Sequence, residues 1–386
     1  MLNMHICIVA HFAYPALAGD VTGHIGGVEH QTTLLARWLA ARGHSVSLIT
    51  WDEGQPSDCV IGGVRVIKLC RKSDGIPGLR FFYPRWTRLN AALRIAKADV
   101  YYQNCGEYVT GQVALWCRRN KRKFIYSVAA LADCDVRLPL MRTAREKFLY
   151  RLGLRLADDV IVQTRTQHQM LQEGFARDSR VIPMPSAGPG EHEFVARTFP
   201  AKDKQRVLWV GRICEEKRPD RFLELARKCP DIQFDLVGPG SNSPYAEDVV
   251  NKARQLPNVV VHGRAMRKQL VEFYQRAVCL CCTSDNEGFP NVFLEAWSYG
   301  LPVVSTLDPD GVITRSKIGY IAADVEKLSL TIGKLLDSPV QWKDTSRRAR
   351  CYYLKNHHAE SILPQFELAF LQAVRGRQSE TFAANA

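Results

Sequence analysis

Short apolar runs alternate with longer polar stretches through the first half of the chain. The predicted strands are His5–Ala10, Ser45–Thr50, Val64–Leu69, Val100–Gln103, Phe124–Val128 and Val160–Thr164. A long glycine-bearing loop follows the first strand. A helix is then predicted over Val28–Arg42, which carries an apolar stripe and is followed by Gly43. Strands that alternate with helices predict an α/β fold with a parallel, doubly wound sheet, in which the loop after the first strand binds ligands.

A second series of the same kind follows Pro183–Pro200, a stretch rich in Pro, Gly and charge that we interpret as the linker. The predicted elements are strands at Arg206–Val210, Ile232–Val237, Val259–His262, Val278–Thr283 and Val303–Thr306, and helices at Pro219–Cys229, Gln341–Lys355 and Ser361–Val374. A chain of 386 residues suggests two domains. We expect one over residues 1–190, a second over 201–355 and a C-terminal segment over 356–386, disordered from Gly376 onward.

The stretch from Val278 to Thr306 combines strand, polar loop, short helix and strand. Pro290 is placed to open the helix and Gly300 to close it. Such a unit points several unpaired backbone N–H groups at one place, with the helix dipole behind them, and so favours an anion such as a diphosphate. Glu287 and Glu295 flank this predicted anion site.

A formal net charge of +13 indicates acidic partners such as phosphorylated substrates, anionic lipid or nucleic acid. Without zinc-ligand spacing, RNP-like or helix-turn-helix patterns, specific nucleic-acid recognition is not expected. Between Arg65 and Lys97 there are nine Lys and Arg residues and one acid, interleaved with Phe81, Phe82, Tyr83 and Trp86. This segment is either a surface that lies on an anionic membrane or a solvated basic helix with a few core aromatics.

The twelve cysteines show no metal spacing, and the cysteines in Val278–Thr283 are expected in a buried strand. A reducing cytoplasm without disulfides is therefore predicted. The apolar N-terminus lacks a basic region and is interpreted as a first core strand, not a signal peptide. No apolar run is long enough for a spanning helix.

The sequence Glu287-Gly288-Phe289-Pro290-Asn291, with Glu295 eight positions after Glu287, resembles the E-x7-E motif of retaining glycosyltransferases of the GT-B fold, family 4. The resemblance implies two facing Rossmann-like domains with a cleft between them. The N-terminal domain would bind the acceptor and the C-terminal domain the nucleotide sugar, and the last helix would return to the N-terminal domain.

The resemblance also implies roles for particular residues. Glu287 would hold hydroxyls of the transferred sugar, and Glu295 the ribose. Arg212 and Lys217 would hold the donor diphosphate, whose growing charge preorganised cations stabilise, although Glu215 or Glu216 could instead hold Lys217 in a salt bridge. Further donor contacts are expected from Gly26, Gly27, Gly211, Gly238, Gly288, Phe289, Pro290 and Asn291. Neither a metal nor another cofactor is expected.

Three segments depart from the family pattern. The family's histidine is missing from Tyr126–Asp133, where Asp133 or nearby Asp135 could contact acceptor hydroxyls or be solvated loop carboxylates. Pro183–Ser186 replaces the family's Asn-Gly-Val-Asp run. Asp308–Ile313 replaces a Gly-Gly loop with a Glu, and so offers backbone N–H groups but puts the choice of donor in doubt.

The leading hypothesis is a retaining hexosyltransferase that uses a nucleoside-diphosphate sugar. Its acceptor would be a lipid-linked saccharide at the inner membrane face, in cell-surface polysaccharide assembly. The alternatives are a transferase for a soluble acceptor, another GT-B enzyme such as an epimerase or phosphorylase, and a non-catalytic nucleotide-sugar-binding or scaffold protein. Joint presence of Arg212, Lys217, Glu287 and Glu295 favours an enzyme.

Overall fold

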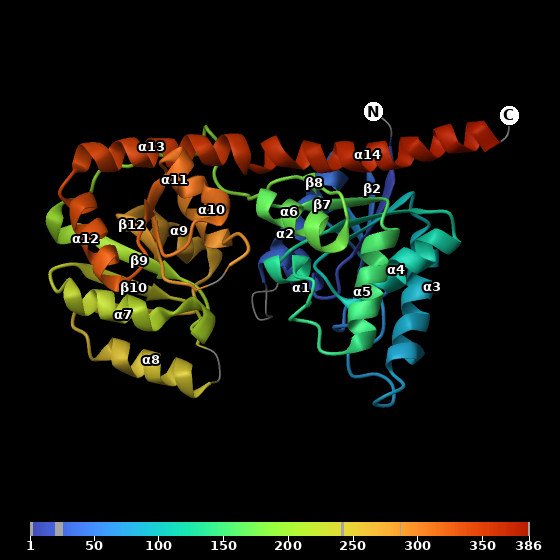
Figure 1. Cartoon of the computed structure of the whole chain (residues 1–386), viewed down its shortest axis with the longest axis horizontal. Coiled ribbons are helices and arrows are strands. Elements are labelled where there is room, and N and C mark those ends of the chain that lie inside the picture. Colours follow the sequence, from blue (N-terminus) through green and yellow to red (C-terminus); the bar gives the residue numbers. More distant parts are fainter. Residues whose placement is uncertain (1–2, 20–25, 241–242, 286, 385–386) are drawn as a thin grey trace. The chain divides into compact units, whose positions relative to one another are not determined.

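The computed structural model describes residues 3–19, 26–240, 243–285 and 287–384. They divide into two compact units (Figure 1). Unit 1 contains the residues up to Pro185 and those from Ile362 onward, and unit 2 spans Ser186–Ser361. Residues 20–25 of the predicted glycine-bearing loop lie outside the described ranges.

Unit 1 contains an eight-stranded sheet of order β3-β4-β2-β1-β5-β6-β7-β8. Its strands are β1 His5–Val9, β2 Ser45–Thr50, β3 Val60–Ile61, β4 Val64–Lys68, β5 Val100–Asn104, β6 Lys123–Ser127, β7 Asp159–Val162 and β8 Arg180–Val181. Each pair is parallel except the short edge hairpin β3–β4. The predicted parallel sheet is therefore confirmed, with one antiparallel edge strand added.

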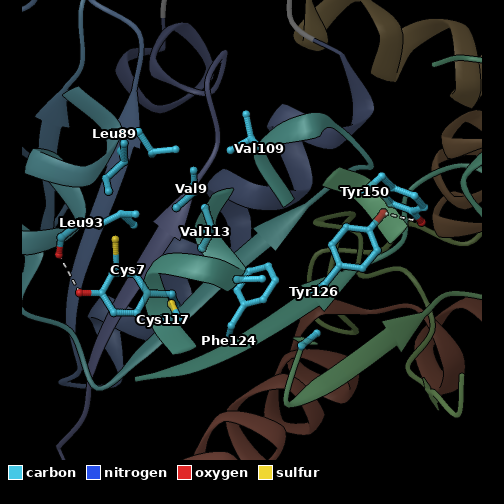
Figure 2. Close-up of a cluster of buried hydrophobic side chains, with 14 of the residues drawn as sticks. Cys7, Val9, Leu89, Leu93, Val109, Val113, Cys117, Phe124, Tyr126 and Tyr150 are labelled. Atoms are coloured by element: carbon cyan, nitrogen blue, oxygen red, sulfur yellow. Dashed lines mark hydrogen bonds between the residues drawn. The ribbon is translucent and has the colours of Figure 1, made fainter. Parts of the chain in front are cut away.

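The helices of unit 1 are α1 Tyr14–Ala18, α2 Gly27–Ala41, α3 Thr87–Ala96, α4 Tyr108–Arg119, α5 Ala144–Leu156 and α6 Arg165–Phe175, joined by most of α14 Ala359–Ala384. Side chains of α3, α4 and α5 pack with Cys7, Val9 and Tyr101 on one face of the sheet (Figure 2). The sequence analysis predicted a continuous loop after the first strand. That prediction was wrong for Tyr14–Ala18, which form the helix α1. A short π-helical segment (Phe81–Trp86) and a 3-10 segment (Leu131–Cys134) add local turns.

Unit 2 contains a six-stranded parallel sheet of order β11-β10-β9-β12-β13-β14. Its strands are β9 Arg206–Val210, β10 Gln233–Val237, β11 Val259–Gly263, β12 Cys279–Cys282, β13 Val303–Ser305 and β14 Gly319–Ile321. Its helices are α7 Pro219–Lys228, α8 Pro244–Arg254, α9 Arg267–Arg276, α10 Asn291–Ser298, α11 Val312–Ser316, α12 Val325–Leu336 and α13 Pro339–Asn356. The five strands predicted for this half all exist.

The C-terminal helix α14 packs on the sheet of unit 1 through one apolar and one charged contact. The rings of Phe366 and Phe370 lie 6.3 and 5.4 Å from that of Tyr102. Glu367 accepts hydrogen bonds from His44 at 2.8 Å and Arg42 at 3.2 Å. This is the predicted return of the last helix. The helix is assigned up to Ala384, and the disorder expected from Gly376 stays a prediction.

None of the helices in the described ranges is long and apolar enough to cross a membrane.

The Glu367 carboxylate is buried beside His44, so its removal is expected to weaken unit 1. Glu367→Ala leaves a buried histidine without its acceptor and should lower the free energy of unfolding by about 2–4 kcal/mol. Glu173→Ala, which removes an exposed carboxylate of α6, should change it by less than about 0.5 kcal/mol. Urea denaturation monitored by fluorescence measures both, and equal midpoints for the two variants would show that the buried contact contributes nothing.

Candidate active site

The candidate site of unit 2 lies where the order of its sheet reverses. β10 and β11 extend to one side of β9, and β12, β13 and β14 to the other. In open parallel sheets, ligands bind beyond the carboxyl ends of the strands at such a point. The loops after β9, β10 and β12 carry most of the predicted donor-binding residues.

Gly211 and Gly238 let the loops after β9 and β10 touch. A Cβ on Gly238 would lie 1.7 Å from the Gly211 carbonyl oxygen, and the φ of Gly238 is +147°, so a side chain is excluded there. The amide of Gly211 donates to the Val237 carbonyl at 3.0 Å. Arg212 follows directly and is exposed, and within the part of the chain that the structure describes no carboxylate pairs with it. The two glycines therefore allow the two loops to pack closely, and the Arg212 side chain next to them is exposed to solvent.

Lys217 and Glu287 form an ion pair between the loops after β9 and β12. Ser284 Oγ donates a second hydrogen bond to the same Glu287 oxygen at 3.0 Å. The two charged side chains are 27% and 16% exposed, respectively. The partner of Lys217 is thus Glu287 and not one of its neighbours Glu215 and Glu216. The structure brings together two residues that the sequence separates by 70 positions.

The buried hydroxyl of Thr283 connects the loop after β12 to the loop after β9. Trp209 Nε1 donates to Thr283 Oγ1 at 3.1 Å, and Thr283 Oγ1 donates to the Lys217 carbonyl at 2.9 Å. Thr283 is fully buried. Because this chain of bonds connects the core of β9 to the backbone of Lys217, it determines where the Lys217 side chain begins.

The helix α10 starts at Asn291, with Pro290 as its N-terminal cap. The side chain of this cap residue makes no hydrogen bond to the first turn, and no acidic residue lies in that turn. One turn further, Glu295 Oε2 accepts a hydrogen bond of 2.5 Å from Tyr274. Burial raises the pKa of Tyr274 well above its ordinary value, and Glu295 raises it further, so this phenol stays a donor at neutral pH. Before the helix, the ring of Phe289 packs 5.2 Å from His357.

The loop after β13 does not offer the free N–H groups that the sequence predicted. Asp308 accepts from the backbone of Ile313 at 2.7 Å and of Thr314 at 3.1 Å. Its carboxylate therefore occupies the amino end of α11. The expectation that this loop supplies backbone donors to the substrate was wrong for these two groups.

The predicted residues of unit 1 lie at the carboxyl end of its sheet. Gly26 caps α2 and Gly27 begins it. A Cβ on Gly26 would lie 2.5 Å from Glu29 Oε2, so the close approach at this glycine is made by a side chain of the same helix.

Asp133 and Asp135, the two candidates for acceptor binding, are both engaged within the protein. Asp133 is 2% exposed and accepts from the amides of Gly106 at 3.3 Å and Ala130 at 3.2 Å. Burial raises its pKa, and the backbone donors partly oppose that rise. Asp135 is bound to Arg137, whose hydrogen bonds lower the pKa of Asp135 to about 2. The geometry gives Asp133 a structural role between two loops.

Two residues that the sequence analysis missed lie beside them. His11 follows β1, and its Nδ1 is 3.6 Å from Glu107 Oε2 at the start of α4. The signal available was the position of each residue, directly after a predicted strand. The basic aromatic segment is divided: Phe81 is buried against Tyr108, whereas Phe82 and Tyr83 are exposed. No group of acidic, histidine and cysteine side chains that could hold a metal occurs among the described residues.

Two family models match the chain in succession. Residues 26–187 match a glycosyl transferase 4-like domain, and residues 191–352 match glycosyl transferases group 1. The D-inositol 3-phosphate glycosyltransferase of Mycolicibacterium smegmatis is 27% identical, over 92% of this chain and 88% of the relative.

Solved structures show the same fold at low identity. Sucrose-phosphate synthase from Thermosynechococcus elongatus superposes with a TM-score of 0.77 at 20% identity and covers 96% of this chain and 99% of that one. Anabaena Alr3699/HepE in complex with UDP-glucose gives 0.70 at 14% identity, with coverages of 96% and 100%. WaaG, a glycosyltransferase involved in lipopolysaccharide biosynthesis, gives 0.64 at 18%, with coverages of 93% and 98%.

The fold is thus that of the GT-B glycosyltransferases. The chain belongs to the glycosyl transferases of group 1, family 4, and is a glycosyltransferase.

Replacing Thr283 tests the connection between the two loops. Thr283→Val keeps the shape but leaves the Trp209 N–H and the Lys217 carbonyl without their partner. We expect the free energy of unfolding to fall by about 2–4 kcal/mol. Thr283→Ser keeps the hydroxyl and should cost about 1 kcal/mol for the lost methyl group. Urea unfolding compares the two, and equal losses would mean that the hydroxyl does not hold these loops.

Proposed function

We propose that the protein transfers a hexose, with retention of anomeric configuration, from a nucleoside-diphosphate sugar to a saccharide acceptor. The acceptor we propose is lipid-linked, at the inner face of the plasma membrane in cell-surface polysaccharide biosynthesis. The observation that carries the donor half of this proposal is the Lys217–Glu287 ion pair, whose Glu287 lies in the loop that leads into α10.

The proposed donor site combines positive and negative groups in the order that a nucleotide sugar requires. Lys217, Arg212 and the N–H groups at the start of α10 would bind the diphosphate, whose charge grows as the glycosidic bond breaks. Glu287 would accept hydrogen bonds from hydroxyls of the sugar. Glu295, already oriented by Tyr274, would accept from the ribose. The neighbour crystallised with UDP-glucose supports a UDP-sugar as the first donor to test.

The reaction is proposed to proceed on one face of the sugar. The acceptor hydroxyl attacks from the side on which the nucleotide leaves, and the departing phosphate oxygen takes its proton. The bond from the anomeric carbon to the phosphate breaks as the bond to the acceptor oxygen forms. Lys217 and Arg212 supply the positive charge for the leaving group, so we propose that no metal is needed and that EDTA leaves turnover unchanged.

The ion pair predicts opposite effects of its two members on nucleotide binding. Lys217→Ala removes a cation from the diphosphate and leaves the Glu287 carboxylate unpaired beside it, so it should weaken UDP binding more than tenfold. Glu287→Gln frees Lys217 from its partner, so UDP should bind as tightly or more tightly while transfer from UDP-glucose is lost. The double variant should bind UDP better than Lys217→Ala alone, because the repulsive carboxylate is then also gone.

Titration calorimetry with UDP and the thermal shift that a bound ligand produces measure these effects. Lys334→Ala, which removes an exposed lysine of α12, is the matched control and should bind like the wild type. Unchanged transfer in Glu287→Gln, or a double variant that binds as weakly as Lys217→Ala, would contradict the proposed site. A wild type that binds nucleotide sugars and never turns them over would favour the binding-protein alternative.

An exposed apolar surface supports the membrane part of the proposal. Ile76, Leu79, Phe82 and Tyr83, here called the aromatic patch, are 55–71% exposed in unit 1. Exposed Arg88 lies in the same basic segment, and the Arg145 guanidinium of α5 lies 3.9 Å above the ring of Phe81. Apolar side chains beside cations favour the headgroup region of an anionic bilayer. The likeness to WaaG is compatible with such an acceptor.

Vesicle sedimentation tests the aromatic patch. The wild type should pellet with phosphatidylglycerol vesicles at low salt and stay in solution with phosphatidylcholine alone. Leu79→Ser with Tyr83→Ser should lose about 2 kcal/mol of apolar transfer and so most of the binding. Leu330→Ser, an equally exposed leucine of α12, should pellet normally. No sedimentation of the wild type at low salt would remove the membrane proposal and favour a soluble acceptor.

A further inference from the structure

The sheet of unit 1 has its own point of reversal, between β1 and β5. β2, β4 and β3 extend to one side of β1, and β5 to β8 extend to the other. The chain segments that leave β1 and β5 therefore flank the position at which an open parallel sheet binds a ligand. Three polar side chains lie there, and two of them have a buried atom without a hydrogen-bond partner among the described residues.

His11 is the first of them. It lies two residues beyond the end of β1, is 8% exposed and stacks on Trp51 at 4.3 Å. Its Nδ1 faces the Glu107 carboxylate at 3.6 Å. Its Nε2 is buried and has no hydrogen-bond partner among the described residues. With the proton on Nδ1, toward the carboxylate, the unpaired Nε2 of the neutral ring is an acceptor.

Gln103 lies on the adjacent strand. In the register of β1 and β5 it is paired with Val9, two residues before His11. Cys7, Val9 and Tyr101 belong to the core beneath α3 and α4 (Figure 2), and the alternation of side chains along a strand directs Gln103 to that same face. Gln103 is 3% exposed; its Nε2 donates to the Cys105 carbonyl at 3.3 Å, and its Oε1 has no partner in the described ranges.

Glu107 gives this group access to solvent. Its side chain is 38% exposed and lies at the start of α4, next to His11. Buried polar atoms without partners each cost about 1–3 kcal/mol of stability, and they are uncommon in folded proteins. Two such atoms lie at a ligand-binding edge of the sheet, and one of the two residues, His11, faces an exposed carboxylate. We take this as an indication that a bound molecule completes their hydrogen bonds.

The chemistry of the three groups identifies that molecule by class. His11 Nε2, Gln103 Oε1 and the Glu107 carboxylate are all acceptors, so they repel phosphate and match a ligand rich in O–H donors. We propose that His11, Gln103 and Glu107 bind neighbouring hydroxyl groups of the saccharide acceptor and select which hydroxyl is glycosylated. This inference rests on the proposed transferase function and adds to it the acceptor-binding residues of unit 1.

The variants are chosen so that a structural role and a binding role give different results. His11→Phe keeps the stacking on Trp51 and removes both ring nitrogens, and Gln103→Leu removes the unpaired oxygen. If the groups serve the acceptor, His11→Phe should not lower the unfolding midpoint, because it removes a buried unsatisfied atom. Gln103→Leu also removes the donor to the Cys105 carbonyl, so it should lower the midpoint by no more than the loss of one hydrogen bond. Glu107→Gln tests the exposed member, with Glu173→Gln on α6 as the control for loss of one surface carboxylate.

The assay uses UDP-glucose with octyl glucoside, galactoside, mannoside and N-acetylglucosaminide as acceptors. We expect each of the three variants to raise the acceptor KM at least tenfold, or to change which octyl glycoside is used. UDP affinity and the slow hydrolysis of UDP-glucose by water should stay unchanged, and Glu173→Gln should behave as the wild type. Wild-type acceptor kinetics in Glu107→Gln and His11→Phe would overturn the inference.

Two further outcomes are separate from that one. Loss of stability and of UDP binding together in His11→Phe and Gln103→Leu would show that these residues only support the fold, and would also overturn the inference. If the wild type neither binds UDP nor turns over any nucleotide sugar, the proposed function itself fails. The proposed acceptor site then also fails. This outcome differs from the others because it is seen with the wild-type protein and not only with the variants.

Discussion

The ion pair between Lys217 and Glu287 is the interaction on which the candidate site depends. Each charge is largely removed from water, and either one alone would bear a desolvation cost that its partner offsets. The pair can form because β9 and β12 are neighbouring parallel strands, so the loops that leave their carboxyl ends meet. Thr283 fixes the backbone below the pair. The sheet order therefore determines the electrostatics of the site.

The amino ends of the helices around this sheet differ in a way that selects one position for an anion. At α11 the N–H groups of Ile313 and Thr314 are already bound by Asp308, so that helix offers them to no ligand. At α10 the cap residue Pro290 offers no side-chain acceptor and no acidic residue lies in the first turn. The loop after β9 carries a lysine and an exposed arginine. In the proposed donor site, the dipole of α10 and these cations act on the same anion.

The sequence predicted most of the strands and the helix that begins after Pro290, because strand periodicity, Pro290 and Gly300 are local signals. It missed the short elements α1, β3, β8 and β14. It did not reveal that Lys217 pairs with Glu287, since that contact depends on which strands become neighbours. The burial of Asp133 could not be predicted from the sequence either. A solvated loop carboxylate and a buried one that binds backbone N–H groups look alike in sequence. The run of aromatic residues at 81–83 could not separate the buried Phe81 from its exposed neighbours, because a π-helical turn with non-helical backbone angles at Tyr83 breaks the regular period there.

The polar groups of the two units differ in kind, and this difference favours two different substrates. Unit 2 presents cations and the amino end of α10, which favour a diphosphate over a neutral sugar. Unit 1 presents a carboxylate, an amide oxygen and an imidazole nitrogen, which accept hydrogen bonds from hydroxyls and disfavour an anion. A net charge of +13 strengthens the attraction for the nucleotide over the whole molecule. In the proposed acceptor site, the Glu107 carboxylate beside His11 would therefore disfavour a charged donor at the place of a neutral acceptor.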